Sequence, residues 1–190
     1  ESPEGLVDWR KFLSNVLPHV DFFVPSIEEL CFMLDRPRYD EWMERAGEED
    51  VTEILDLEKD IRPLAAQAME LGVKVLMLKC GARGMYYQTA GADLIGKIPA
   101  AVELKVEDWT EKSGFQKSFI PEKVLSGTGA GDSSIGCFLY SMLKGYPVER
   151  CIQLAAAQGA SCVEAVDTLS GLHTLPELEE KIAAGWKTAE

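Results

Sequence analysis

A glycine-rich turn ahead of an apolar segment contains the residues best suited to chemistry. The stretch 126–138 reads SGTGAGDSSIGCF. Gly129, Ala130 and Gly131 carry almost no side chain, so a charged group can reach their backbone N–H groups. A helix that begins here adds the positive end of its dipole. The turn, which also contains Thr128, is therefore predicted to bind an anion.

Asp132 is the single acid of this turn. A carboxylate beside an anion site is electrostatically unfavourable unless it has a task there. One such task is that of a general base, which accepts a proton from a substrate hydroxyl while the neighbouring amides stabilise the developing charge. The other is structural, because aspartate is among the best residues for capping the N-terminus of a helix. The residues alone leave both interpretations open.

The spacing of the glycines excludes two common nucleotide-binding motifs. A Walker P-loop needs Gly-Lys-Ser or Gly-Lys-Thr at its end, and the turn lacks it. The dinucleotide motif G-x-G-x-x-G opens a βαβ unit, whereas Gly127, Gly129 and Gly131 have a different spacing and lie late in the chain. A dinucleotide-dependent oxidoreductase is therefore the weakest of the functional alternatives.

Two helices are expected to position the turn. Apolar residues recur with helical spacing from Ile135 to Leu143, and Gly145 and Pro147 end this helix. A second helix is expected over about residues 148–163, with a face made of alanines and one glycine. Such a small face suits close packing against another helix or contact with a flat ligand.

The earlier part of the chain is expected to alternate between helices and strands. Residues 20–24 and 73–78 are typical of buried strands, and the second run is almost continuously apolar, as in a strand covered on both faces. Helices are predicted from Asp8 to Pro18 and from about 57 to 71. A helix followed by a strand is half of a parallel α/β unit.

Smaller motifs complete this pattern. Ser26 and Glu29 form an S-x-x-E capping box at the start of another helix. Gly81 and Gly84 permit a tight turn into a hairpin. The remaining expectations are a solvated, charged excursion over 35–55 with a short helix near Trp42, a hairpin strand over 85–88, and short strands near 93–98, 101–106 and 115–124.

Composition bounds the class of protein. The 190 residues, 46% of them hydrophobic, suffice for one domain with a core over 1–190. A net charge of −13 argues against binding to a nucleic-acid backbone. The five cysteines include no C-x-x-C pair and are expected to be reduced packing thiols rather than disulfide or metal ligands. No leader-like or bilayer-length apolar stretch is found, so a cytoplasmic protein without a membrane partner is expected.

The turn resembles the C-terminal motif D-T-x-G-A-G-D of the ribokinase-like (PfkB-type) carbohydrate kinases. Residues 129–132, GAGD, match the motif fully, whereas Ser126 stands in place of its first Asp and Gly127 in place of Thr or Ser. Three further segments resemble the family in the same order: 24–29 resembles the strand end with N-x-x-E, with Ser26 for Asn; 78–84 resembles the turn T-L-G-x-x-G, with Lys79 for Thr; and 154–160 resembles the alanine-rich helix beside the adenine.

This resemblance implies an α/β fold. The family has a Rossmann-like, doubly wound and mostly parallel sheet flanked by helices. The resemblance covers essentially the whole chain but only the C-terminal part of that fold, so the N-terminal part and the lid are expected to be absent. An uncovered sheet edge would follow. We therefore expect either a homo-oligomer or a missing N-terminal part.

The resemblance also implies a reaction, the transfer of the γ-phosphate of ATP to a hydroxyl of a carbohydrate or a related small alcohol. Asp132 would accept the proton of the attacking hydroxyl, and the amides of Gly129, Ala130 and Gly131 would stabilise the transferred phosphoryl group. The alternative is a truncated, non-catalytic nucleotide-binding or interaction module of the same fold.

Further roles follow from the resemblance for the nucleotide and its metal. Lys79, Gly81 and Gly84 would lie along the phosphates and ribose, Thr128 in the phosphate cradle, and Ala156 and Gly159 beside the adenine. Glu29 would hold the hydration shell of Mg²⁺, a role compatible with its place in the capping box. A potassium ion is the further cofactor that the resemblance allows, although Ser126 removes a carboxylate from that site.

Overall fold

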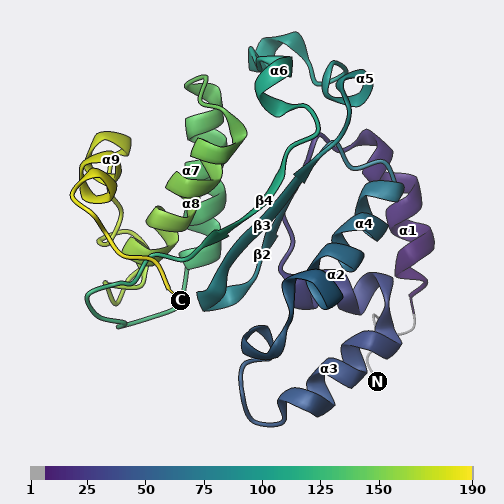
Figure 1. The fold of residues 1–190 in the computed structure, drawn as a ribbon, viewed down its shortest axis with the longest axis horizontal. Helices are drawn as coiled ribbons and strands as arrows, with labels where there is room; N and C mark the ends of the chain where they lie inside the picture. The colour runs from purple at the N-terminus through teal and green to yellow at the C-terminus, as the bar shows by residue number, and fades with distance from the viewer. Residues whose placement is uncertain (1–6, 190) are drawn as a thin grey trace.

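A computed structural model describes residues 7–189, in which a four-stranded sheet lies between two sets of helices (Figure 1). The strands stand in the order β1-β2-β3-β4, and they are β1 (Phe22–Phe23), β2 (Val75–Lys79), β3 (Gly84–Thr89) and β4 (Ser113–Lys117).

The sheet is mixed, which corrects the mostly parallel sheet expected from the sequence. Strands β1 and β2 are parallel, whereas the pairs β2–β3 and β3–β4 are antiparallel. The reason is the connections. Helices link β1 to β2, but a three-residue 3₁₀ turn, η5 (Gly81–Arg83), folds the chain straight back from β2 into β3. The next connection brings the chain back antiparallel along the free edge of β3 and forms β4. Beside this pairing, the Thr89 N–H donates to the Lys112 carbonyl at 2.8 Å.

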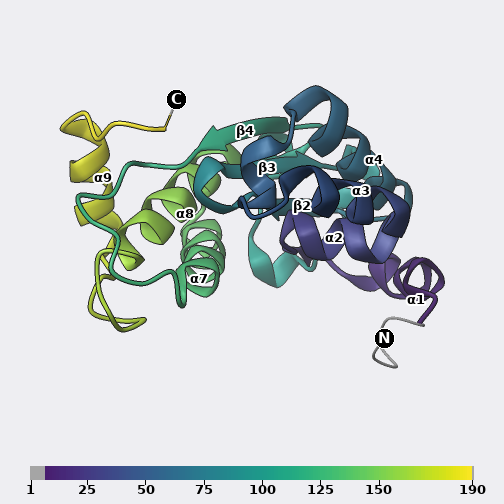
Figure 2. The ribbon, with the colours of Figure 1, turned by 90° about the horizontal axis from the view of Figure 1, so that it is seen from below.

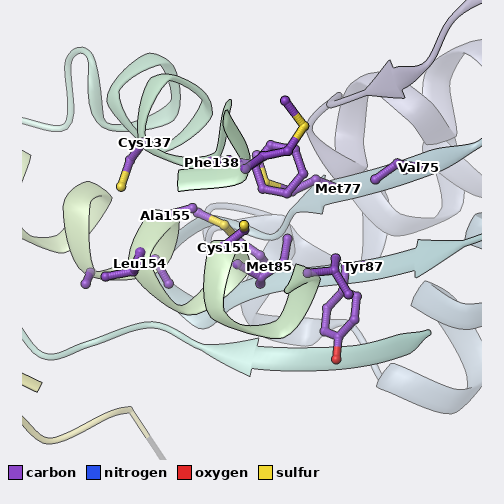
Figure 3. Close-up of a cluster of buried hydrophobic side chains, with 14 of the residues drawn as sticks. Val75, Met77, Met85, Tyr87, Cys137, Phe138, Cys151, Leu154 and Ala155 are labelled. Atoms are coloured by element: carbon purple, nitrogen blue, oxygen red, sulfur yellow. The ribbon is translucent and has the colours of Figure 1, made fainter. Parts of the chain in front are cut away.

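Two hydrophobic cores lie on the two faces of the sheet, because successive strand residues point in opposite directions. Val75 and Met77 belong to one core, and Leu76 and Leu78 to the other. In Figure 3 the first core surrounds Phe138, which is fully buried. Strand β2 therefore supports both layers of the fold.

Helices cover the two faces separately (Figures 1 and 2). One face carries α7 (Ala130–Leu143) and α8 (Val148–Cys162), with α9 (Leu175–Ala183) packed on α8. The other face carries α1 (Trp9–Val16), α2 (Ile27–Leu34), α3 (Arg36–Ala46) and α4 (Arg62–Glu70). The short elements between them are η2 (Leu17–His19), η3 (Val51–Ile54) and the π-helical turn η4 (Leu57–Ile61).

Local sequence signals account for the helix ends. The Asp8 carboxylate accepts a hydrogen bond from the Lys11 N–H at 3.0 Å and caps α1. Both hydrogen bonds of the predicted capping box at Ser26 and Glu29 are present at the start of α2. Gly72, with φ of +94°, follows the end of α4.

The charged excursion expected over 35–55 is largely a folded helical segment. Helix α3 buries Trp42 completely, and its indole N–H donates to the Asp60 carboxylate at 3.2 Å. Burial of this large ring anchors the segment on the core shared with α2 and α4. Its charged residues thus occupy only the outer face.

The two short strands expected over 93–98 and 101–106 are wrong, because that region forms the short helices α5 (Ala92–Ile95), η6 (Ala100–Val102) and α6 (Val106–Trp109). Ile95 and Ile98 are both buried there, although a strand would place residues three apart on opposite faces. The strand expected over 115–124 is partly present as β4, after which the chain continues as a loop.

All five cysteines are free and buried, as expected of packing thiols. Burial raises the pKa of the Cys80 thiol to about 12 and that of Cys151 to about 11. Over residues 7–189, no helix has the length and apolar character needed to cross a bilayer.

Candidate functional site

A cavity of about 610 Å³ lies where the turn after β2, the start of α7 and the small face of α8 meet. Most of the residues predicted to bind a nucleotide line it, although they come from distant parts of the sequence: Lys79, Gly81, Gly84, Ala130, Gly131, Ala156 and Gly159. Thr128, Gly129, Asp132 and Glu29 are not part of its lining.

The N-terminus of α7 depends on a glycine in the left-handed conformation. Gly129 is the N-cap residue with φ of +82°, and a Cβ there would lie 2.6 Å from Cγ2 of Thr168. Asp132 instead lies in the first turn of the helix, so the capping interpretation of this residue is wrong. Its side chain is exposed and makes no hydrogen bond or ion pair with any residue in 7–189.

The amides of the turn are not equally open. The Thr128 N–H donates to Oγ of Ser126 at 3.2 Å, and the Ala130 N–H donates to the Gly127 carbonyl at 3.3 Å. By contrast, the N–H groups of Gly129 and Gly131 donate no hydrogen bond to any part of the chain that the structure describes. These two amides lie at the positive end of α7, where an anion could accept hydrogen bonds from them.

Lys79 supplies a cation at the same place. It ends β2, where its backbone N–H donates to the Pro25 carbonyl at 3.0 Å. Its ammonium reaches the start of α7, since a Cβ on Gly131 would lie only 3.3 Å from Nζ. The Lys79 ammonium and the open Gly131 amide thus converge on one end of the cavity and would bind the same anionic group.

The turn after β2 also requires its glycines. Gly84 has φ of +131°, and a Cβ there would lie 2.0 Å from the Gln116 carbonyl oxygen, so no other residue fits. Gly81 has φ of +56°, and a Cβ there would lie 2.6 Å from Oγ1 of Thr52. Both glycines line the cavity with their backbone. Larger side chains at these positions would fill part of the cavity.

The small face of α8 packs directly on the start of α7. A Cβ on Gly159 would lie 2.5 Å from Oγ of Ser134, which donates to the Ala130 carbonyl at 2.7 Å. Close helix packing is therefore one role of this face. Ala156 and Gly159 also line the cavity, so the same face is available to a flat ligand.

Glu29 lies outside this cavity. Its Oε2 accepts a hydrogen bond from the Ser26 N–H at 2.8 Å, and the exposed residue lines a second cavity of about 650 Å³ beside β1 and α2. Ser26 forms a backbone bridge with Lys79, which links Glu29 to the strand end at the first cavity. Residues 7–189 contain no cluster of three or more acidic, histidine or cysteine side chains suited to a metal.

Mg²⁺ fits this site only as an ion carried by phosphates. Proteins commonly bind it through one or two carboxylates together with substrate phosphates and waters. Glu29 offers one such carboxylate, and its Oε1 accepts no hydrogen bond from the residues described.

Asp50 also lines the cavity, and no motif in the sequence predicts its presence there. It lies in the charged segment expected to be a solvated excursion, and no local motif connects it to the glycine turns. The Asp-x-Thr spacing of Asp50 and Thr52 is a local turn signal, with the Thr52 N–H donating to the Asp50 carboxylate at 2.8 Å. That signal indicates a turn but not a ligand site.

Comparison with known proteins identifies the family. The model of the pfkB family of carbohydrate kinases matches residues 5–175, so the chain belongs to this family. An uncharacterised sugar kinase of Archaeoglobus fulgidus is 26% identical over 168 residues, which cover 88% of this chain and 48% of that protein. A ribokinase of Arabidopsis thaliana is 29% identical over 107 residues, covering 56% of this chain and 23% of that protein.

Solved structures show the same fold over part of their length. The structure of Arabidopsis thaliana ribokinase complexed with ribose and ATP has a TM-score of 0.61 at 22% identity, covering 88% of this chain and 42% of that one. A putative ribokinase II from E. coli in complex with ATP and Mg²⁺ has a TM-score of 0.60 at 22% identity, covering 92% and 43%. The chain thus spans less than half the length of these relatives.

Proposed function

We propose that the protein is the ATP-binding and catalytic part of a sugar kinase, which transfers the γ-phosphate of ATP to a hydroxyl of a carbohydrate or a related small alcohol. The observation that carries the proposal is the convergence of Lys79 and the open Gly131 amide at one end of the cavity. Membership of the pfkB family and the ATP named in the solved relatives support it.

The cavity has the features that a nucleotide needs. Its phosphates would lie at the cationic end, against Lys79 and the N-terminus of α7, since both favour negative charge. The adenine would lie toward Ala156 and Gly159, where the small face of α8 leaves room for a flat ring. Gly81 and Gly84 would bring the backbone of their turn against the phosphates and ribose between these two ends.

Asp132 would act as the general base. Its exposed carboxylate has no other partner in residues 7–189, so it is free to accept the proton of a sugar hydroxyl. The hydroxyl oxygen forms a bond to the γ-phosphorus, the bond from that phosphorus to the bridging oxygen breaks, and ADP leaves with that oxygen. The Gly129 and Gly131 amides would stabilise the charge that develops on the phosphoryl oxygens.

The cations of the reaction would be held loosely by this part of the protein. Mg²⁺, when bound, neutralises phosphate charge, and Glu29 would contact its hydration shell. A potassium site would have to use the Ser126 hydroxyl and backbone carbonyls in place of a carboxylate. Ser126 is already a hydrogen-bond acceptor for the Thr128 N–H.

The sugar site would need a further part. The outer edge of β1 pairs with no other strand among residues 7–189, and the second cavity lies beside it. Either the remainder of a longer chain or a second copy would cover this edge. We place the protein in the cytoplasm, where buried free thiols stay reduced.

A coupled kinase assay over a panel of sugars, combined with calorimetry of Mg-ATP binding, tests the proposal. Both measurements use the protein together with the remainder of a longer chain, or with the second copy, that completes the fold. Asp132→Asn should slow phosphate transfer by roughly 10²-fold to 10⁴-fold while the affinity for Mg-ATP changes little. Asp93→Asn, an exposed aspartate in the first turn of α5, is the matched control and should leave the rate unchanged.

Three results separate the functions. An unchanged rate in Asp132→Asn refutes the assignment of the base. Binding of Mg-ATP without phosphorylation of any sugar favours the alternative, a non-catalytic nucleotide-binding module, which is supported by the partial length of the chain relative to the solved kinases. Tighter binding of NAD than of ATP would favour an oxidoreductase instead.

A further inference from the structure

Asp50 brings a carboxylate to the cavity from a segment far from both glycine turns. One of its oxygens, Oδ1, is fully engaged, because it accepts hydrogen bonds from the Thr52 N–H at 2.8 Å and from the Thr52 hydroxyl at 2.7 Å. The other oxygen, Oδ2, accepts no hydrogen bond within residues 7–189. Asp50 therefore has a fixed orientation and one free acceptor.

The segment of Asp50 is held against the turn after β2. Oγ1 of Thr52 lies 2.6 Å from the position that a Cβ on Gly81 would take. The Arg83 guanidinium donates to the Thr52 carbonyl at 3.2 Å and also to the Leu55 carbonyl. These contacts fix η3 on the same turn that lines the cavity.

Two charged side chains, Asp50 and Lys79, are found among the described residues that line the cavity. The Lys79 ammonium lies beside Gly131 at the start of α7, whereas Asp50 belongs to the segment packed on Gly81. A phosphate beside Asp50 would be repelled, because like charges at short range are costly in a partly enclosed site. The group that suits Asp50 is a neutral hydrogen-bond donor, and a hydroxyl is the simplest of these.

We propose that Asp50 accepts a hydrogen bond from a ribose hydroxyl of the bound nucleotide and so makes the site selective for ribonucleotides over deoxyribonucleotides. This inference rests on the proposed function, because it takes the ligand to be ATP. It adds a specificity-determining residue that lies outside the glycine turns and outside the catalytic group.

Calorimetry with Mg-ATP, Mg-2′-deoxy-ATP and Mg-3′-deoxy-ATP tests the proposal on the full chain. The unmodified protein should bind Mg-ATP roughly 10-fold more tightly than at least one deoxy analogue, as expected for a hydrogen bond to a charged group. Asp50→Ser keeps a hydroxyl that can cap the Thr52 N–H but removes the free carboxylate oxygen. In this variant the three nucleotides should bind with nearly equal affinity.

Glu53→Gln is the matched control, because Glu53 is an exposed acid of the same 3₁₀ turn outside the cavity lining. This substitution removes a negative charge near the site, and the variant should still bind Mg-ATP more tightly than the deoxy analogue. Equal affinities in the unmodified protein, or a preference that survives in a folded Asp50→Ser variant, would overturn the role of Asp50 alone. Failure of Mg-ATP to bind at all would overturn both this inference and the proposed function.

Discussion

The Lys79 ammonium lies against Gly131, so that a Cβ on this glycine would be 3.3 Å from Nζ. The contact joins the end of β2 to the first turn of α7, two elements that are distant in the sequence. It places a side-chain cation next to a backbone N–H that has no partner among the described residues. Both donors would act on one anionic group, and each can be tested separately.

Replacing Lys79 by methionine removes the cation and keeps a chain of similar length. We expect the dissociation constant of Mg-ATP to rise by roughly 10-fold or more, because a charge-assisted hydrogen bond contributes more than a neutral one. Calorimetry measures the change, with Lys97→Met as a control at an exposed lysine outside the cavity. An equal loss of affinity in both variants would assign the effect to net charge rather than to the Lys79 contact.

Gly131→Ala separates helix stability from ligand binding. Glycine inside a helix costs roughly 0.5 to 1 kcal/mol relative to alanine, so the free energy of unfolding should stay constant or rise. The new methyl group would crowd the Lys79 ammonium and the open amide, so Mg-ATP should bind several-fold more weakly.

Gly136→Ala is the matched control for this experiment. Gly136 lies in the same helix, and a Cβ there meets nothing within 4 Å. Gly136→Ala should raise the free energy of unfolding by roughly 0.5 to 1 kcal/mol without weakening nucleotide binding. A Gly131→Ala variant that binds Mg-ATP normally would show that the ligand does not approach the start of α7.

Gly159→Ala should destabilise the fold by about 1 to 3 kcal/mol, because its Cβ would lie 2.5 Å from Oγ of Ser134 in the contact between α7 and α8. Urea unfolding measures the loss. Ser134→Ala removes the clashing oxygen, so the double variant should recover a large part of the stability lost in Gly159→Ala. Strictly additive effects of the two substitutions would show that the helices approach each other differently.

The buried thiols predict a loss of stability at high pH. Desolvation raises the pKa of Cys80 from 9.0 to about 12, so the folded state holds this proton more tightly than the unfolded state does. The stabilisation is complete below pH 9 and is lost as the pH rises toward 12. Between pH 8 and pH 10 the contribution of one such thiol falls by roughly 1 kcal/mol.

Urea unfolding of Cys80→Ala at both pH values isolates this contribution. The variant starts from a lower stability, but its free energy of unfolding should fall less between pH 8 and pH 10 than that of the unmodified protein. Parallel losses in the two proteins would assign the pH dependence to other groups, such as Tyr86, whose pKa is also raised by burial.

Features encoded by neighbouring residues could be predicted from the sequence. The capping box at Ser26 and Glu29, the hairpin at Gly81 and Gly84, and the helix from Ala130 each depend on contacts within a few residues. The small side chains of the turn and the start of a helix at Ala130 are likewise local features, and the binding of an anion there stays a prediction.

Features that depend on tertiary packing could not be predicted. The burial of Trp42 and the approach of Asp50 to the cavity arise because a charged segment folds back onto the core and onto Gly81. The capping role considered for Asp132 failed because Gly129 takes the left-handed conformation three residues earlier. The predicted strands over 93–98 and 101–106 failed because their apolar residues pack as helical turns.

Strand β2 has a further consequence for the energetics of the whole molecule. Its alternate side chains enter both cores, and its last residue is Lys79. A ligand held by Lys79 is thus attached to β2. Because β2 packs in both cores, it can separate from the sheet only when the helices on both faces come away. Such a ligand should slow hydrogen exchange most strongly at the amides that open through global unfolding, and proteases should meet resistance throughout the domain instead of at one loop.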